Sequence, residues 1–105
     1  MKKIIDAPTI GDGRFKRWTK TVSKVDTSKT NGFCFEGDFI RSKQELEIGT
    51  YILAYGEEGS RNRHSACVEL YEVTEDGLKK IYDKRGLSPH WALDVRDDIA
   101  RIVNK

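Results

Sequence analysis

The segment Arg14–Lys20 combines side chains that bind anions with side chains that stack on flat rings. Four basic residues interleave with two aromatic residues over seven positions. A strand of this composition can lay guanidinium and ammonium groups along a phosphate backbone while an aromatic ring stacks on a base. The segment therefore predicts a polyanion-binding strand, whose candidate contact residues are Arg14, Lys16, Arg17, Trp18 and Lys20.

The orientation of Trp18 decides whether this strand has a stacking ring. Lys16, Trp18 and Lys20 share one parity, so in a strand their side chains project to the same face. If Trp18 faces solvent, the ring and the basic stripe coincide. If Trp18 lies in the core, these lysines cannot all follow it inward, and the basic residues mark only a solvated face.

A second basic segment, residues 59–64, reads Gly-Ser-Arg-Asn-Arg-His. It joins flexible backbone to a hydroxyl, two guanidinium groups and an imidazole, which suit a phosphate or a carboxylate. Glu57 and Glu58 precede it and offer the alternative of a solvated hairpin tip in which arginine pairs with glutamate. Arg61 and Arg63 complete the predicted polyanion-binding set.

Metal and nucleophile chemistry have weaker signals. Cys34, His64, Cys67 and His90 are ligand types for zinc, but the sequence has no Cys-x-x-Cys pair, so we predict no metal site and no cofactor. Cys67 with His64 or His90 is the one thiol-based candidate for nucleophilic catalysis. No nucleophile-elbow, dinucleotide or phosphate-loop motif occurs, so no catalytic residue is assigned and the enzyme remains a third hypothesis.

Length and composition predict one globular domain. The chain has 105 residues, of which 37% are hydrophobic and 34% charged, and this is too apolar for a disordered chain. The net charge of +2 gives no preference for nucleic acid, membrane or an acidic partner. The distribution is uneven, because residues 1–30 carry eight basic and three acidic side chains and residues 31–60 carry two and six.

Targeting signals and cysteine usage predict a location. No apolar run approaches the ~20 residues that cross a bilayer, and the first six residues contain no signal-peptide core. We expect a cytoplasmic protein without membrane contact. Two cysteines make no disulfide framework, and in a reducing compartment both are expected to be packed thiols.

Alternation of side-chain type predicts strands over most of the chain. The first spans residues 15–26, and the second spans 33–41 with Phe33, Phe35 and Phe39 pointing together into the core. Residues 51–55 are apolar on both parities and predict a central strand. Residues 56–63 predict a mobile loop, and residues 65–74 a strand whose parity changes near Leu70, as at a bulge. A short fifth strand follows over residues 78–82.

The C-terminal segment has helical periodicity. Ser88 is expected to cap the helix with Pro89 at its first position, and Trp91, Val95 and Ile99 share one face. We expect an α+β fold that is mainly β: a curled or barrel-like antiparallel meander of about five strands, closed by one C-terminal α-helix. As one domain it comprises an irregular N-terminal arm (1–13), for which a short edge segment is the alternative, the meander (14–83) and the helix (88–104).

Two functional hypotheses of different classes follow. The first is a small non-enzymatic binding module that contacts nucleic acid or another polyanion through the basic first strand and the arginine-rich loop. The alternative is a protein-interaction or regulatory subunit without a nucleic-acid role, which pairs through a free strand edge or an apolar patch and can form a homo-oligomer.

Overall fold

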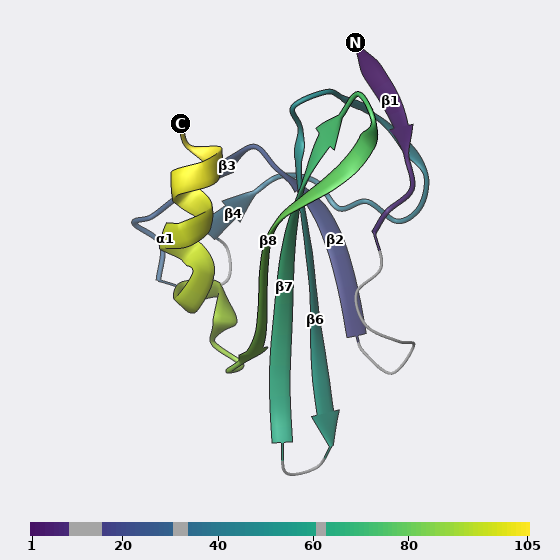
Figure 1. Cartoon of the computed structure of the whole chain (residues 1–105). Helices are drawn as coiled ribbons and strands as arrows, with labels where there is room; N and C mark the ends of the chain where they lie inside the picture. Colours follow the sequence, from purple (N-terminus) through teal and green to yellow (C-terminus); the bar gives the residue numbers. More distant parts are fainter. Residues whose placement is uncertain (9–15, 31–33, 61–62) are drawn as a thin grey trace.

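The computed structural model describes residues 1–8, 16–30, 34–60 and 63–105, and for residues 16, 17, 58–60, 63 and 64 it describes the backbone alone. Eight strands and one helix lie in the described ranges (Figure 1). They are antiparallel strands followed by a C-terminal helix, so the mainly β prediction is confirmed. The barrel is not confirmed, because the strands that the structure describes form one open four-stranded sheet and two two-stranded sheets.

The four-stranded sheet has the order β2-β6-β7-β8. Its strands are β2 (Lys16–Val22), β6 (Tyr51–Ser60), β7 (Arg63–Thr74) and β8 (Gly77–Leu87). β6 lies between two neighbours, and Ile52, Leu53 and Ala54 are fully buried, as the apolar run on both parities predicted. The register of β7 on β8 shifts between Leu70 and Tyr71, where the parity change predicted a bulge.

The β6–β7 hairpin is longer than the sequence indicated. Residues 56–63 were predicted to be a mobile loop, but those of them that the structure describes, 56–60 and 63, continue the antiparallel ladder up to the Ser60–Arg63 pair. Polar composition and glycine lowered the strand signal there, while backbone pairing in the ladder does not depend on side-chain polarity. The hairpin extends beyond the ends of β2 and β8 (Figure 1).

Two small sheets complete the β structure. β1 (Lys2–Ile5) pairs with β5 (Gln44–Glu47), so residues 2–5 form a short strand, which agrees with the edge-segment alternative and not with an irregular arm. The partner strand is about 40 residues away in the chain, and no local pattern reports it. β3 (Lys24–Val25) pairs with β4 (Phe35–Glu36).

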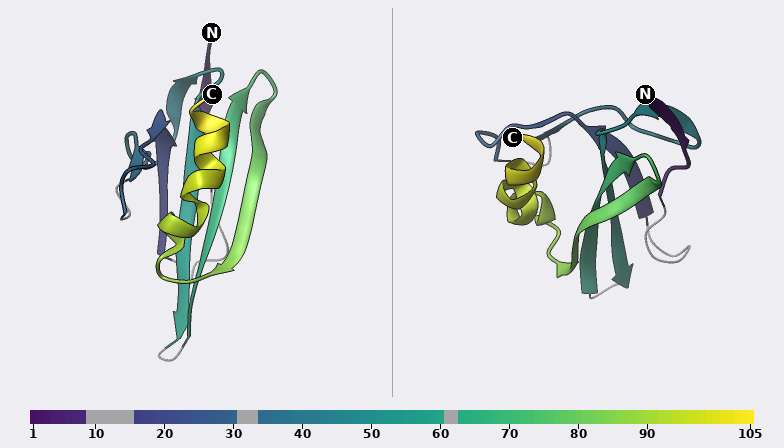
Figure 2. Two further views of the ribbon diagram at one scale, coloured as in Figure 1. Left: turned by 90° about the vertical axis from the view of Figure 1, so that its left-hand side faces the viewer. Right: turned by 45° about the horizontal axis from the view of Figure 1, so that its top comes forward.

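Helix α1 (Trp91–Val103) packs on one face of the four-stranded sheet (Figure 2). Its N-cap residue is His90, so the helix begins later than the Ser88 cap predicted. The Ser88 hydroxyl instead accepts a hydrogen bond from the His90 backbone N–H at 3.1 Å and so stabilises the turn before the helix. Beyond the helix, the Asn104 amide accepts from Val25 N at 2.9 Å and donates to Val25 O at 2.6 Å, which fastens β3 to the helix end.

The two faces of the sheet have separate cores. On one face α1 covers Leu53, Val68 and Leu70 with its buried residues Val95 and Ile99. On the other face β1 and β5 cover a second cluster that is built from Ile5, Ile40, Leu46, Ile52 and Val73. In the described part of the chain, no helix is long and apolar enough to span a membrane.

Candidate functional site

Residues 36–40 run antiparallel beside β2 and extend the sheet at its edge. Thr21 N donates to Asp38 O at 2.8 Å, and Ile40 N donates to Thr19 O at 2.9 Å. Lys20 and Phe39 form an isolated bridge between the two segments. This pairing places Phe39 and Arg41 beside the basic strand, although they come from a different part of the chain.

Gly37 allows this approach. A Cβ atom at Gly37 would lie 1.7 Å from the carbonyl oxygen of Thr21, so no other residue fits without moving the backbone. Asp38 N also donates to the Thr21 hydroxyl at 3.0 Å. The segment is therefore held by backbone contacts to β2 that require glycine at one position.

Trp18 lies at the surface end of a row of aromatic rings. Its ring stacks on Tyr55 with centroids 5.5 Å apart, and Tyr55 contacts Trp91 of α1 at 4.7 Å. Trp91 in turn stacks on the buried ring of Phe35 at 6.0 Å. Trp18 remains 39% exposed, so it is not a core residue, although one face of its ring packs on Tyr55.

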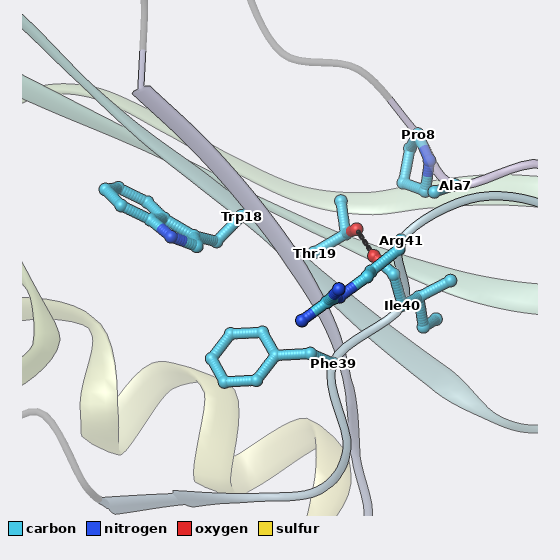
Figure 3. Close-up of a pocket in the computed structure, with 7 residues that line it drawn as sticks. All are labelled: Ala7, Pro8, Trp18, Thr19, Phe39, Ile40 and Arg41. Carbon is cyan, nitrogen blue, oxygen red and sulfur yellow. Dashed lines mark hydrogen bonds between the residues drawn. The ribbon is translucent and has the colours of Figure 1, made fainter.

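An open pocket of about 590 Å³ lies at this strand edge. Its lining residues are Ala7, Pro8, Trp18, Thr19, Phe39, Ile40 and Arg41 (Figure 3). The rings of Trp18 and Phe39 project to the same side of β2 in Figure 3. Since side chains alternate along an extended segment, Phe39 and Arg41 share one side and the carboxylate of Asp38 faces the other.

Phe39 does not enter the core, contrary to the prediction for the row of three phenylalanines. Phe35 is buried against Trp91, but Phe39 is 59% exposed, and Phe33 lies outside the described residues. Phe35 belongs to the buried cluster that the residues of α1 complete, and Phe39 does not. The ammonium group of Lys20 lies over the Phe39 ring, 5.2 Å from its centroid.

Two cations lie near Phe39 and differ in their contacts: Lys20, over its ring, and Arg41, which lines the pocket. Lys20 Nζ donates to the carbonyl oxygen of Phe35 at 2.8 Å, which fixes the position of its charge. Arg41 is exposed, and it has no hydrogen bond or ion pair within the described ranges. The other arginines whose side chains are described each pair with a carboxylate, and they are Arg85, Arg96 and Arg101.

The structure assembles only part of the predicted polyanion-binding set. Trp18 and Lys20 lie on one strand with the same parity, as predicted, and Trp18 lines the pocket, while Arg14 and Arg61 lie outside the described residues. Lys16 and Arg17 begin β2, and Arg63 begins β7 at the far end of the long hairpin. Tyr55 is opposite Trp18, and Ser60 at the hairpin end lies five positions further along β6, roughly 17 Å at about 3.4 Å per residue.

Cys67 is not placed with His90. Cys67 alternates with Val68, whose side chain faces α1, so its thiol lies on the opposite sheet face, where it contacts Gly56 O at 3.8 Å. His90 is the exposed N-cap of α1, and the side chain of His64 is not among those described.

Cys34 is buried as well, and burial raises the pKa of its thiol. The described residues contain no group of three or more His, Cys, Asp or Glu side chains that could hold a metal ion.

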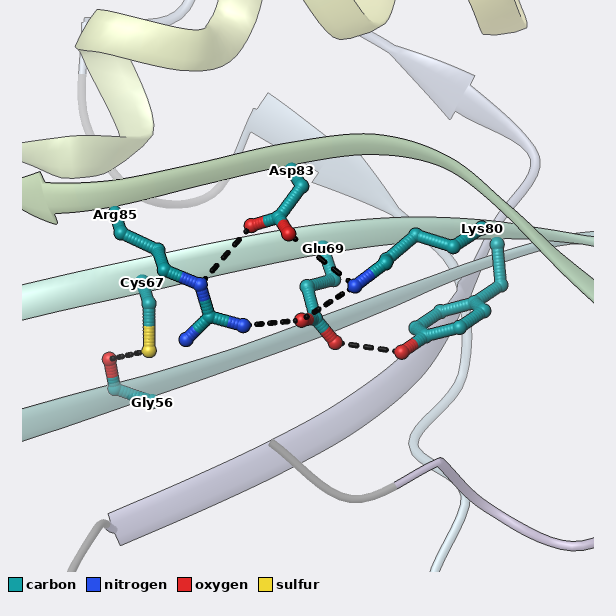
Figure 4. A network of polar contacts seen from close by, with 7 residues as sticks. Gly56, Cys67, Glu69, Lys80, Asp83 and Arg85 are labelled. Atoms are coloured by element: carbon teal, nitrogen blue, oxygen red, sulfur yellow. Dashed lines mark hydrogen bonds and ion pairs between the residues drawn. The ribbon is translucent and has the colours of Figure 1, made fainter. Parts of the chain in front are cut away.

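A buried carboxylate that the sequence analysis missed lies on the same face as Cys67. Glu69 is 3% exposed, and its Oε2 accepts from Arg85 at 2.8 Å and lies 3.4 Å from Lys80 Nζ (Figure 4). The Tyr71 hydroxyl donates to Oε1 at 2.5 Å, and Asp83 contacts both cations. The available signal was an acidic residue between Val68 and Leu70. These contacts join β7 to β8 and leave the Glu69 carboxylate fully paired, so the cluster is structural.

This cluster predicts an alkaline dependence of stability. Burial, together with the hydrogen bond to Glu69, raises the pKa of Tyr71 far above its ordinary value near 10. As the pH rises, the tyrosine in the unfolded chain loses its proton before Tyr71 in the folded protein does. The contribution of Tyr71 to the free energy of unfolding is therefore fully present below about pH 10 and decreases above it. Urea unfolding between about pH 8 and 11 measures this decrease, and we expect it to be smaller in Tyr71→Phe. If the free energy of unfolding of Tyr71→Phe falls with pH as steeply as that of the wild type, Tyr71 is not its cause.

The site is thus two exposed rings and two cations on one side of a glycine-dependent strand pair. Sequence reasoning found Trp18 and Lys20 through their alternation, but it missed Phe39 and Arg41, which only the pairing of residues 36–40 with β2 brings near. No protein-family model, no curated protein and no solved structure matches the chain.

Proposed function

We propose that the protein is a non-enzymatic binding module that contacts nucleic acid, or another polyanion, through Trp18, Lys20, Phe39 and Arg41. One observation carries the proposal. Among the described side chains, Trp18 and Phe39 are the exposed aromatic ones, and both line one pocket with Arg41, whose guanidinium has no carboxylate partner within the described residues.

Physical chemistry supports an anionic ligand at this surface. An exposed guanidinium without a carboxylate partner can form paired, charge-assisted hydrogen bonds with a phosphate. The ammonium of Lys20 adds a second fixed positive charge near Phe39. Lys16 precedes Trp18 on the same strand with the same parity, and in this proposal it continues the basic stripe, with Arg14, Arg17, Arg61 and Arg63 as further contacts.

Arg41→Glu tests this proposal. Replacement of a phosphate-contacting cation by an anion is expected to weaken binding of a labelled oligonucleotide about tenfold or more at low salt. The slope of log affinity against log salt should also fall by about one, because one counterion release is lost. Fluorescence anisotropy between about 50 and 200 mM salt measures both quantities.

Lys79→Glu is the matched control. It changes the net charge by the same amount, but Lys79 is exposed on β8, the strand at the opposite edge of the four-stranded sheet from β2, three strands and about 14 Å away at about 4.8 Å per strand. The control should retain nearly all of the affinity. Equal losses in the two variants would show a nonspecific effect of net charge and would contradict the proposed surface.

The second candidate is a protein-interaction subunit, and the exposed residues of the N-terminal strand favour it. Met1 and Ile4 are the most exposed large apolar side chains of the described residues, and Ile4 lies on β1, a strand of a two-stranded sheet. Such an edge can pair with a strand of another chain. Sedimentation equilibrium separates the candidates: mass that rises with concentration, without any oligonucleotide binding, favours this one.

A further inference from the structure

We propose that the ligand is specifically single-stranded nucleic acid, with one base stacked on the outer face of Trp18. This inference rests on the proposed function and deepens it. A polyanion can be held by charge alone, whereas the arrangement of rings behind Trp18 points to a ligand that offers flat, accessible aromatic faces.

The row of rings prepares Trp18 for stacking. One face of its indole lies on Tyr55, which is supported by Trp91 and Phe35 down to the core. The outer end of the row is still partly exposed. Because the ring is already ordered by these contacts, little side-chain entropy is lost when a base extends the row. Base–aromatic stacking tolerates any base, since every base has a π-face.

The spacing of the second ring requires bases that are separated from each other. Phe39 pairs with Lys20, two residues along β2 from Trp18, so Trp18 and Phe39 are diagonal neighbours about 7–8 Å apart at their backbones. Successive bases in a duplex are stacked at about 3.4 Å and their faces are covered. Two bases on the two rings must therefore be unstacked, which single strands allow and duplexes do not.

Arg41 supplies the backbone contact between the two rings. It follows Phe39 after one buried residue and projects to the same side, and its guanidinium has no described partner to displace. A phosphate between two splayed nucleotides can accept its paired hydrogen bonds. The site then reads one phosphate and two bases without sequence preference.

Three probes of equal length and charge separate stacking from charge. They are a single strand of about ten thymidylates, an abasic strand with the same number of phosphates, and a hairpin duplex. We expect the thymidylate strand to bind at least about 5- to 150-fold more tightly than the abasic strand, because this is the range for loss of one base–aromatic stack and the abasic strand loses both. Tryptophan emission should be quenched by the thymidylate strand and not by the abasic strand or the duplex.

Two variants assign the effect to the ring. Trp18→Ala should weaken thymidylate binding by about 5- to 150-fold, as expected for one stack, and leave abasic binding unchanged, and Trp18→Phe should retain part of the preference. Trp91→Phe keeps a ring in the stack, so quenching should persist there while it is lost in Trp18→Phe. Thermal unfolding of each variant establishes that it is folded at the temperature of the titration.

The outcomes distinguish this inference from the proposed function. If abasic and duplex probes bind as tightly as the thymidylate strand and Arg41→Glu still weakens them, polyanion binding stands and stacking is wrong. If no probe binds at about 50 mM salt, both are wrong. A preference for bases that is unaffected by Trp18→Ala would overturn the role of Trp18.

Discussion

Gly37→Ala is expected to lower the free energy of unfolding by about 3 kcal/mol and to abolish the binding surface. The added Cβ would lie 1.7 Å from the carbonyl oxygen of Thr21 and would overlap it. Residues 36–40 must therefore move away from β2. That movement breaks backbone hydrogen bonds such as Thr21 N to Asp38 O. Urea unfolding and oligonucleotide anisotropy measure the two effects.

Gly86→Ala is the control for this substitution. Gly86 has φ +69°, but a Cβ there would meet no atom within 4 Å, so only the left-handed backbone is strained. We expect a loss of about 1 kcal/mol and full binding. A Gly37→Ala variant as stable as Gly86→Ala would show that residues 36–40 do not pack on β2 as described.

Trp91→Ala is expected to destabilise the protein by about 2–3 kcal/mol. This is below the usual cost for a fully buried tryptophan because Trp91 is partly exposed. The substitution removes the ring between Tyr55 and Phe35, and with it a contact between α1 and the sheet. Trp18 keeps Tyr55 but loses the support behind it, so the base-dependent part of binding should also decrease.

Leu93→Ala controls for removal of a large side chain from the same helix. Leu93 is in the first turn of α1 and exposed, so its truncation should cost less than about 0.5 kcal/mol and leave binding unchanged. Chemical unfolding of both variants gives the comparison. Equal losses would mean that the ring row contributes no more to stability than an exposed leucine does.

Much of the fold follows from local patterns. The alternation through Trp18 and Lys20 predicted β2, the fully apolar run at Ile52–Ala54 predicted the central strand, and the change of parity at Leu70 predicted the bulge. The helix was predicted from its apolar spacing, with an error of a few residues at its N-terminus. In each case the signal lies within one element.

The unpredicted features all depend on contacts between distant segments. β1 needs β5, and the position of Phe39 beside Lys20 needs residues 36–40 on the edge of β2. Phe39 had the parity of a core residue, but parity reports a face and not whether a helix covers that face. Glu69 was missed because its partners Lys80 and Arg85 come from the next strand. Side-chain pairing across strands has no counterpart in a local pattern.

The most direct test of the binding surface is a map of amide shifts on the whole protein. A ¹⁵N-labelled sample is titrated with a single strand of about ten thymidylates at low salt. The largest shifts are expected at the Trp18 indole and at the amides of Thr19, Phe39 and Arg41. Shifts confined to β1 or to the outer face of α1, or no shifts at all, would contradict the proposed function.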